Sequence, residues 1–336
     1  MNVLSTRVLP QKGLDLLEAA GCKVTIYTEK RELTPAQLIN LCLGQDVLLS
    51  SGPNHIDEDF LKACSHLKGI ALLSVGYDKV DLEAATRYGI PVSNTPDVIT
   101  QTTADTAFLL MLAVSRNAFA MSRSIAQGEW QFYDPTANLG LDLYGKTLGI
   151  FGMGRIGFDL ATKCKAYFGM NVIYHNRNPR PDDEQQLGAQ YVSFNELLKQ
   201  SDVLSVHASL STETKGLFNR EAFAQMKPSS IFINTARGGM HDEDDLTEAL
   251  RNKTIWGSGL DVTNPEPMDK NNPLLQMQNV FVLPHIGSAT IETRDNMSVK
   301  AAENVIAAVL GRRMPNILNP DVYLKQPVEE MLINKR

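Results

Sequence analysis

Three residues whose side chains can transfer a proton or bind an anion follow predicted strands in the second half of the chain. They are Arg237, Glu266 and His285, and each lies within five residues of a strand end. The predicted strands are residues 230–234, 257–261 and 280–283. Parallel strands point the same way, so their carboxyl ends share one edge of a sheet. We therefore expect the three side chains to gather at that edge.

Together these side chains suit the reduction of a 2-oxo acid, in which a hydride reaches the carbonyl carbon and a proton reaches its oxygen. A histidine that titrates near neutral pH can donate the proton, and a neighbouring carboxylate favours its imidazolium form. An arginine can bind the substrate carboxylate and stabilise the charge that develops on the oxygen. We assign Arg237, Glu266 and His285 as catalytic residues, with Arg237 and His285 also binding the substrate.

Each of these residues also has a structural explanation when it is taken alone. Arg237 can be a surface charge, Glu266 a turn residue between two prolines, and His285 a hydrogen-bonded interior histidine. Their joint occurrence at strand ends, in a chain that also carries a nucleotide-binding motif, favours the functional interpretation.

That motif is a glycine-rich segment near the middle of the chain. A buried strand at 148–151 leads into GMGRIG at 152–157, followed by a helix to residue 168 and a second strand at 171–174. Gly152 makes the tight turn, Gly154 lets the backbone approach a pyrophosphate, and Gly157 lets the helix pack on the strand. The amides of Arg155 and Ile156 open the helix, where its dipole favours an anion. In this setting the motif predicts a dinucleotide site.

The residues after the second strand predict which nicotinamide cofactor is bound. An NAD site usually places a carboxylate about 20 residues beyond the glycines, where it accepts the ribose 2′-hydroxyl. Asn176 stands at that position, and Arg177 and Arg180 follow. Arginine pairs with a 2′-phosphate, which an aspartate would repel. We expect these three residues to bind the cofactor and NADPH to be preferred over NADH; solvated loop arginines are the alternative.

A possible anion site lies in the first hundred residues. The sequence SVGYD at 74–78 ends a predicted strand. In open α/β sheets, ligands bind outside the carboxyl ends of the strands. Gly76 leaves backbone N–H groups accessible, so Val75 and Gly76 can bind a small anion such as a carboxylate. A simple turn is the alternative.

Composition narrows the class of protein. The chain has 336 residues, of which 43% are hydrophobic and 21% charged, and a net charge of −6, as in a soluble globular protein of two domains. It has no basic tract, long apolar run or signal-peptide pattern, so we expect no nucleic acid, no membrane and a cytoplasmic location. The four cysteines are scattered without metal-ligand spacing, which indicates reduced thiols and no metal site.

Strands and helices alternate along the chain, which predicts an α/β fold with doubly wound parallel sheets. A long amphipathic helix from residue 102 toward 127 should bridge two domains, and residues 131–144 should form a loop. The chain after Ile286 is long enough to return to the first domain. We therefore predict a substrate-binding domain from residues 1–98 and 288–336, and an NAD(P)-binding domain from residues 99–287.

The motifs resemble those of a known family. The segments GMGRIG (152–157), FINTARG (232–238), GLDV (259–262) with PEP (265–267), and PHIGS (284–288) are similar to signatures of the D-isomer-specific 2-hydroxyacid dehydrogenases. The similarity spans nearly the whole chain. It implies a Rossmann nucleotide domain, a flavodoxin-like substrate domain, a homodimer and an active site in the cleft. It also implies that Arg237, Glu266 and His285 form the catalytic set.

Further roles are implied by the same resemblance. The backbone of Val75 and Gly76 would bind the substrate carboxylate, and Asp261 would hold the nicotinamide amide. Cofactor contacts are also implied for Thr103, Thr235, Ala236 and Gly287.

Within the family, four segments are most similar to glyoxylate/hydroxypyruvate reductases and 2-ketogluconate reductases. They are LLSVGYD (72–78), GEW (128–130), the Asn176-Arg177 pair, and IGSAT (286–290) with ETR (292–294). Relatives acting on formate carry glutamine in place of Glu266, and phosphite-oxidising relatives carry lysine near Val75, so both are disfavoured. The expected activity is NADPH-dependent reduction of glyoxylate, hydroxypyruvate or 2-ketogluconate to D-2-hydroxy acids. The alternatives are another D-2-hydroxyacid dehydrogenase, including one with phosphite or phosphonate dehydrogenase-like activity, and a non-enzymatic nucleotide-sensing protein.

One segment departs from the family pattern. After Arg237-Gly238 the family usually has an apolar pair before Asp-Glu, whereas this chain has Gly239, Met240 and His241. We expect this departure to loosen the loop that carries Arg237.

Overall fold

The computed structural model describes residues 1–324, and contacts between residues divide the chain into two compact units. Unit 1 comprises residues 1–99 and the segment from residue 290 onward, and unit 2 comprises residues 100–289. These boundaries differ by one or two residues from the expected ones, 1–98 with 288–336 and 99–287. Residues 325–336 of the expected first domain lie outside the described part.

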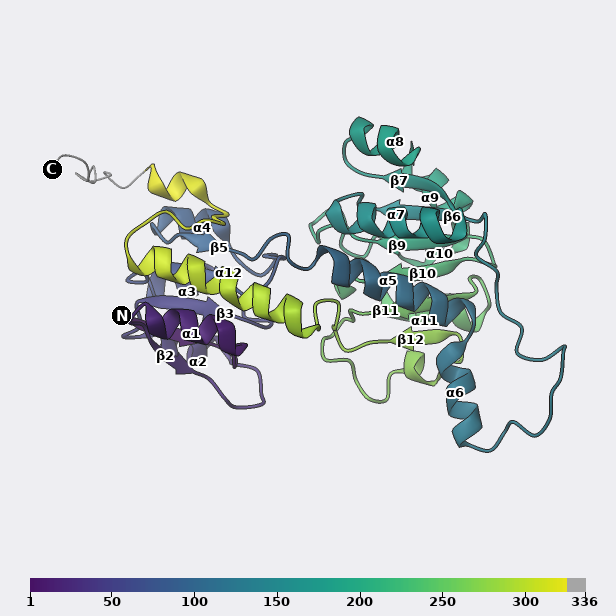
Figure 1. Ribbon diagram of the computed structural model, residues 1–336, viewed down its shortest axis with the longest axis horizontal. Coiled ribbons are helices and arrows are strands. Elements are labelled where there is room, and N and C mark those ends of the chain that lie inside the picture. Colours follow the sequence, from purple (N-terminus) through teal and green to yellow (C-terminus); the bar gives the residue numbers. More distant parts are fainter. Residues whose placement is uncertain (325–336) are drawn as a thin grey trace. The chain divides into compact units, whose positions relative to one another are not determined.

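Within the described residues, unit 1 is built on a five-stranded parallel sheet in the order β2-β1-β3-β4-β5 (Figure 1). The strands are β1 (Asn2–Ser5), β2 (Lys23–Ile26), β3 (Val47–Ser50), β4 (Gly69–Leu72) and β5 (Val92–Ser93). The helices are α1 (Gln11–Ala19), α2 (Pro35–Cys42), α3 (Glu58–Ala63), α4 (Leu82–Arg87), α12 (Ile291–Val309) and η3 (Pro320–Tyr323). The core residues of α1 and α12 pack on one face of the sheet, and those of α2, α3 and α4 pack on the other. This is the strand order of flavodoxin-like sheets, as the family resemblance implied.

Unit 2 contains, within the described residues, a seven-stranded parallel sheet in the order β12-β11-β10-β9-β6-β7-β8 (Figure 1). The strands are β6 (Thr147–Phe151), β7 (Asn171–His175), β8 (Gln190–Tyr191), β9 (Val203–Val206), β10 (Ile231–Asn234), β11 (Gly257–Leu260) and β12 (Val280–Val282). The helices are α5 (Thr100–Ser115), α6 (Ala118–Ala126), α7 (Arg155–Phe168), α8 (Pro181–Leu187), α9 (Phe194–Gln200), α10 (Arg220–Gln225), η1 (Gly238–Met240), α11 (Glu243–Arg251) and η2 (Pro273–Gln276).

The helices of unit 2 cover both faces of this sheet. Core residues of α5, α7 and α8 pack on one face, and those of α9, α10 and α11 pack on the other. Counted from β6, the order extends the Rossmann arrangement 3-2-1-4-5-6 by one strand. The α/β doubly wound prediction is therefore confirmed. The strands β6, β9, β10 and β11 therefore end at the same edge of the sheet, next to the glycine turn that follows β6.

The predicted bridging helix from residue 102 to 127 is wrong in one respect, because it is two helices. α5 ends at Ser115, and α6 begins at Ala118 after Asn117, whose φ of 50° is left-handed. Asparagine adopts this conformation more readily than most residues. The carbonyl of Ser115 accepts a hydrogen bond from the amide of Leu141 (2.7 Å), a partner that the local sequence pattern does not reveal.

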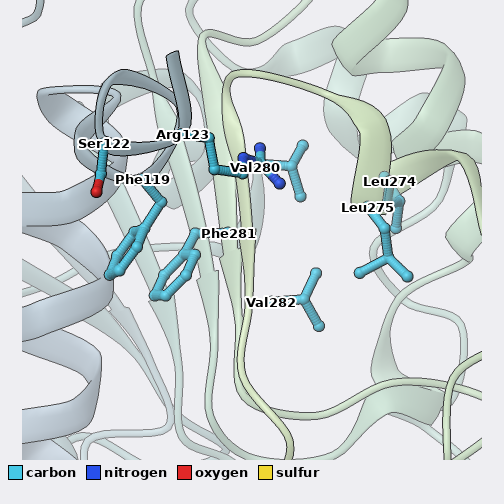
Figure 2. A pocket seen from close by; sticks show the side chains of 8 residues that line it. All are labelled: Phe119, Ser122, Arg123, Leu274, Leu275, Val280, Phe281 and Val282. Atoms are coloured by element: carbon cyan, nitrogen blue, oxygen red, sulfur yellow. The ribbon is translucent and has the colours of Figure 1, made fainter. Parts of the chain in front are cut away.

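A small apolar cavity of about 220 Å³ lies under α6, next to β12 and η2 (Figure 2). Figure 2 shows the rings of Phe119 and Phe281 stacked at its side, with Arg123 nearby. Arg237, Glu266 and His285 do not line it. Its lining has no proton donor suited to the expected chemistry, so the candidate active site lies elsewhere in the unit.

The structure also describes the state of the cysteines, the length of the apolar helices and the grouping of possible metal ligands. All four cysteines are buried free thiols, and burial raises the pKa of Cys164 to about 12. Over residues 1–324, no helix has both the length and the apolar character needed to cross a membrane. In the same part of the chain, no three His, Cys, Asp or Glu side chains are grouped to hold a metal ion.

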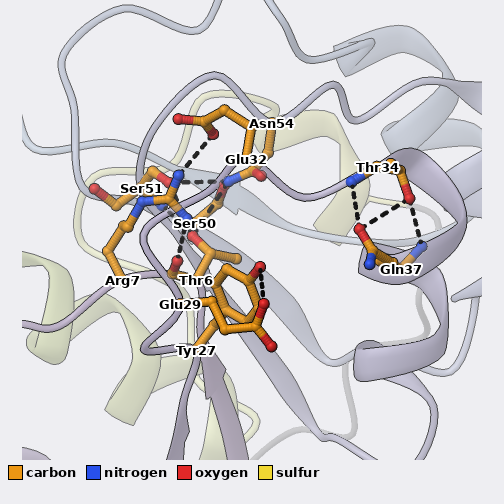
Figure 3. Close-up of polar contacts among 10 residues, drawn as sticks. All are labelled: Thr6, Arg7, Tyr27, Glu29, Glu32, Thr34, Gln37, Ser50, Ser51 and Asn54. Atoms are coloured by element: carbon orange, nitrogen blue, oxygen red, sulfur yellow. Dashed lines mark hydrogen bonds and ion pairs between the residues drawn. The ribbon is translucent and has the colours of Figure 1, made fainter.

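A capping box marks the start of α2. Thr34 caps α2, with Pro35 as its first residue (Figure 3). The hydroxyl of Thr34 accepts a hydrogen bond from the amide of Gln37, and the Gln37 side chain accepts one from the amide of Thr34. This capping box satisfies two amides that would otherwise lack a partner at the helix start.

Candidate active site

His285 and Glu266 form an ion pair in loops that follow neighbouring strands. Nδ1 of His285 lies 2.8 Å from Oε1 of Glu266. The side chains are 48% and 42% exposed, so the pair faces the surface of unit 2. Because the carboxylate orients the ring through Nδ1, Nε2 is the nitrogen suited to exchange a proton with a ligand.

A buried carboxylate fixes the loop that carries His285. Asp261, 1% exposed, accepts hydrogen bonds from the amides of Ile286 (2.7 Å) and Gly287 (2.8 Å). Burial raises the pKa of Asp261, and these two amides oppose the rise. They hold His285 at a φ of 54°, which is rare for a residue other than glycine. Backbone strain of this kind is often found at functional sites.

Three of the expected cofactor-contacting residues lie together at this loop. The hydroxyl of Thr103 on α5 donates to the carbonyl of Gly287 (3.3 Å), and Gly287 is bonded to Asp261. A side chain at Gly287 would lie 3.0 Å from Oδ2 of Asp261. Thr103, Asp261 and Gly287, which are distant in sequence, therefore form one contact group.

The loop after β10 carries Arg237 and contacts the loop that carries Glu266. A side chain at Gly238 would lie 2.0 Å from the carbonyl oxygen of Thr263, so only glycine allows these two backbones to approach so closely. Nη1 of Arg237 donates to the carbonyl of Ala236 (2.7 Å). Since β10, β11 and β12 are neighbours in the sheet, the structure brings the loops of Arg237, Glu266 and His285 to one edge.

The expectation of a loosened Arg237 loop is wrong. The side-chain amide of Asn234 donates to the carbonyl of Arg237 (2.9 Å), and the same nitrogen lies 3.1 Å from Nδ1 of His241. Met240 is 0% exposed and His241 is 2% exposed, so these two of the three departing residues belong to the core rather than to the loop surface. Burial lowers the pKa of His241 to about 4, an effect that the charge of Asp242 opposes.

The glycine turn after β6 has the shape that a pyrophosphate requires. A side chain at Gly152, whose φ is 94°, would lie 2.4 Å from the amide nitrogen of Ala208, and one at Gly157 would lie 2.8 Å from Ile150. A side chain at Gly154 would meet no atom within 4 Å. Gly154 is the N-cap of α7 and has no side chain that could cap the first amides of the helix, an arrangement that suits a bound anion. These residues fit a bound dinucleotide, with Arg155 and Ile156 in the first turn of α7.

The residues after β7 differ from one another in what they contact. The Asn176 side chain accepts from the amide of Met153 (2.6 Å) and donates to its carbonyl (3.2 Å), so it braces the glycine turn. Arg180 forms an ion pair with Asp183 in the first turn of α8. Arg177 is exposed. The sequence analysis assigned cofactor binding to all three residues, but in the structure each has a different environment.

The expected residue Thr235 lies beside His207, which the sequence interpretation missed, whereas the amide of the expected residue Ala236 donates to Oδ1 of Asn234 (2.9 Å). Nε2 of His207 lies 2.8 Å from Oγ of Ser205, and Nδ1 lies 3.5 Å from Oγ1 of Thr235. Desolvation lowers the pKa of His207 to about 3, although part of the residue stays accessible. The signal available in the sequence was a polar residue at the end of β9, the strand next to the glycine turn.

In unit 1, the loop after β4 presents backbone amides at the carboxyl edge of the sheet. The carbonyl of Val75 accepts from the side chain of Asn94 (2.8 Å), and that of Gly76 accepts from the hydroxyl of Ser74 (2.8 Å). Among the described residues, none accepts a hydrogen bond from the amide of Val75 or Gly76. Both amides are therefore available to an anion such as a carboxylate.

The neighbouring strand ends are held by a buried polar cluster. The amide nitrogen of Asn54 bonds Thr6, Ser50 and the carbonyl of Ser51 at 2.9 to 3.2 Å, as Figure 3 shows. Thr6 in turn donates to that carbonyl and accepts from the Ser51 amide. This cluster ties the carboxyl ends of β1 and β3, and β3 is the neighbour of β4 in the sheet.

Comparison with known proteins gives a consistent result. Residues 108–287 match the family model described as D-isomer specific 2-hydroxyacid dehydrogenase, NAD binding domain. A glyoxylate reductase of Thermococcus litoralis is 40% identical over 330 residues, which cover 97% of this chain and 99% of the relative. The glyoxylate reductase/hydroxypyruvate reductase of Homo sapiens is 39% identical over 320 residues, covering 95% and 98%. The crystal structure of an NADPH-dependent glyoxylate/hydroxypyruvate reductase from Sinorhizobium meliloti, in complex with NADP and malonate, has a TM-score of 0.82 at 31% identity, covering 94% and 96%.

Proposed function

The chain belongs to the D-isomer-specific 2-hydroxyacid dehydrogenase family, and from that premise we propose that it reduces small 2-oxo acids to D-2-hydroxy acids with NADPH. The candidate substrates are glyoxylate, hydroxypyruvate and 2-ketogluconate. The observation that carries the proposal is the 2.8 Å pair of His285 and Glu266 beside the loop of Arg237. Relatives named glyoxylate reductase and glyoxylate reductase/hydroxypyruvate reductase, at 39–40% identity, support the substrate class.

The proposed division of labour follows from the contacts. A bound nicotinamide cofactor supplies the hydride. His285 donates a proton from Nε2 to the substrate oxygen, while Glu266 holds the ring and favours its imidazolium form. Arg237 binds the substrate carboxylate and stabilises the developing oxyanion.

The two units have separate proposed roles. Unit 2 binds the nucleotide through the glycine turn and through Thr103, Thr235, Ala236, Asp261 and Gly287. Unit 1 binds the substrate carboxylate through the amides of Val75 and Gly76, whose carbonyls accept hydrogen bonds from Asn94 and Ser74 respectively.

NADPH preference rests on the charges after β7. Arg177 is exposed and carries the positive charge that suits a 2′-phosphate, whereas Arg180 is held by Asp183. The pKa of Glu213 is lowered by a hydrogen bond from Ser211 and, to a smaller extent, by the charge of Arg177. The Sinorhizobium meliloti relative is NADPH-dependent.

The proposed homodimer rests on exposed apolar side chains between α6 and β6. Trp130, Phe132, Tyr133 and Leu139 are 66–83% exposed, although large apolar side chains are usually buried. Within unit 2 this segment extends away from the sheet and its helices (Figure 1). A cluster of exposed apolar groups is typical of an interface. Sedimentation equilibrium of the wild type and a Trp130→Ser/Phe132→Ser/Tyr133→Ser variant tests it: the wild type should be a dimer and the variant a monomer.

The activity is tested by following NADPH and NADH oxidation with each of the three acids and assigning the product's configuration by chiral chromatography. His285→Gln should lower kcat by about 10²- to 10⁴-fold, and Arg237→Ala should raise KM and lower kcat. Near-full kcat in His285→Gln would rule out this histidine as the acid. Unchanged KM and kcat in Arg237→Ala would remove the arginine from the site.

A further inference from the structure

Two side chains near the start of α11 hold the loops that carry Arg237 and Glu266. They belong to His241, which follows η1, and to Glu243, the first residue of α11. His241 contacts Asn234 at the end of β10, the residue that bonds the carbonyl of Arg237, and Glu243 contacts the loop of Glu266 directly. We call residues 241–243 the brace.

The hydrogen bonds around Asn234 determine which ring nitrogen of His241 carries its proton. Oδ1 of Asn234 accepts from the amide of Ala236 (2.9 Å), and Nδ2 donates to the carbonyl of Arg237 (2.9 Å), so the amide cannot be reversed. The second N–H of Nδ2 therefore donates to Nδ1 of His241 (3.1 Å), which must be unprotonated. The proton lies on Nε2.

A histidine at position 241 has an unfavourable free-energy contribution that an apolar side chain there would not have. Nε2 of His241 is buried and has no hydrogen-bonding partner among the described residues. A buried N–H without a partner is unfavourable, whereas the bond at Nδ1 completes the hydrogen bonding of Asn234. The imidazole thus supplies an acceptor, Nδ1, for the side-chain amide of Asn234. The same amide group donates to the carbonyl of Arg237.

Glu243 makes the corresponding contacts with the loop that carries Glu266. One carboxylate oxygen accepts from the amide of Asn264 (2.6 Å), two residues before Glu266. The other accepts from the side-chain amide of Asn272 (2.8 Å), beyond Glu266. The carboxylate therefore ties the loop on both sides of Glu266.

We infer that the brace sets the position of Arg237 relative to the His285–Glu266 pair, with His241 and Glu243 as positioning residues. The two loops already touch where Gly238 meets Thr263, so a shift in either loop is transmitted to the other. The inference rests on the proposed function, because it assigns Arg237 and Glu266 their roles there.

The two positioning residues have different expected kinetic effects. Loss of the His241 bond frees the Arg237 loop, so KM for the 2-oxo acid should rise by about tenfold or more, since small misplacements of a binding group are costly. Loss of the Glu243 bonds frees the Glu266 loop. Without the Glu243 bonds, kcat should fall by about tenfold and KM should change less. The reason is that Glu266 orients the proton donor His285, whereas Arg237 binds the substrate carboxylate.

The experiment compares His241→Leu with His241→Asn, and Glu243→Ala with Glu243→Gln, in the full chain. Asparagine can place an oxygen acceptor close to the position of Nδ1, and glutamine keeps an acceptor for the Asn264 amide, so both should restore part of the loss. Asp244→Asn is the matched control, because it removes an exposed carboxylate from the same helix start. We would measure kcat and KM with glyoxylate, the Kd of NADPH, Tm, and hydrogen–deuterium exchange of residues 234–240 and 262–267.

We expect faster exchange of residues 234–240 in His241→Leu and of residues 262–267 in Glu243→Ala. KM and kcat should change as given above, and the Kd of NADPH should not change. Variants that lose only Tm, with wild-type KM, kcat and segment exchange in the folded protein, would overturn the inference. Wild-type protein that reduces none of the three acids would refute the proposed function instead. In that case the exchange data would still decide whether the brace holds the loops.

Discussion

Nδ1 of His285 and Oε1 of Glu266 lie 2.8 Å apart although the residues belong to loops after different strands. Both side chains are more than two-fifths exposed, so this ion pair adds little to stability because solvent screens it. Its effect is on orientation, since it turns Nδ1 toward a carboxylate and leaves Nε2 for a ligand. Four predictions follow from this geometry and from the groups around it.

Glu266→Ala should lower kcat by about tenfold or more, and Glu266→Gln should lower it less. Alanine removes the partner that orients the His285 ring through Nδ1, whereas glutamine can keep a hydrogen bond there. Steady-state kcat and KM of both variants with glyoxylate measure the difference. Wild-type kcat in both variants would show that the carboxylate does not orient the acid.

Arg177→Ala should lower kcat/KM for NADPH by roughly 10- to 100-fold while changing that for NADH little. A charge-assisted hydrogen bond to a phosphate contributes about 1.5–3 kcal/mol. Arg180→Ala is the comparison, and its effect should be smaller because Asp183 already holds that guanidinium. Wild-type protein that clearly prefers NADH would refute the proposed cofactor preference.

Gly154→Ala should fold as stably as the wild type but bind NADPH about tenfold or more weakly, a loss of about 1.4 kcal/mol. The added methyl meets nothing in the chain and the φ of −96° suits alanine, so only an incoming pyrophosphate would be obstructed. Gly157→Ala is the contrasting variant, because its methyl would lie 2.8 Å from Ile150 and should destabilise the fold by about 1–3 kcal/mol. Calorimetric titration with NADPH and thermal unfolding separate the two effects, and unweakened binding by Gly154→Ala would argue against a pyrophosphate at this turn.

Burial of His241 should make the protein less stable as the pH falls. Its pKa is lowered from 6.5 to about 4 in the folded chain. Between these values the unfolded chain binds the proton and the folded chain does not, so the stabilisation is complete above about pH 6.5 and decreases toward about pH 4. Each pKa unit corresponds to about 1.4 kcal/mol, so the loss is a few kcal/mol at most.

Tm measured from about pH 7.5 down to about pH 5 tests this. His241→Asn removes the titrating group and should give a shallower decline than the wild type, whereas replacement of the exposed His55 by Asn should not. Equal slopes for all three proteins would contradict the assignment to His241.

The features that depend on short segments could be predicted from residue types and spacing. They are the alternation of strands and helices and the turn at Gly152, which arise from the conformational preferences of a few adjacent residues. Polar residues at strand ends also predicted which loops matter, because parallel strands deliver Arg237, Glu266 and His285 to one edge whatever the rest of the fold does.

Which partners these residues have depends on the tertiary fold. The helix breaks at Asn117, Asn176 contacts Met153, and His241 bonds Asn234. Each of these features depends on atoms brought together by folding. His241 illustrates the reason most clearly. A pattern of residue types predicted a looser loop, whereas burial keeps the imidazole neutral and gives it a hydrogen bond that holds the loop. That outcome depends on solvent exclusion and on a partner seven residues away, neither of which a residue's type or spacing specifies.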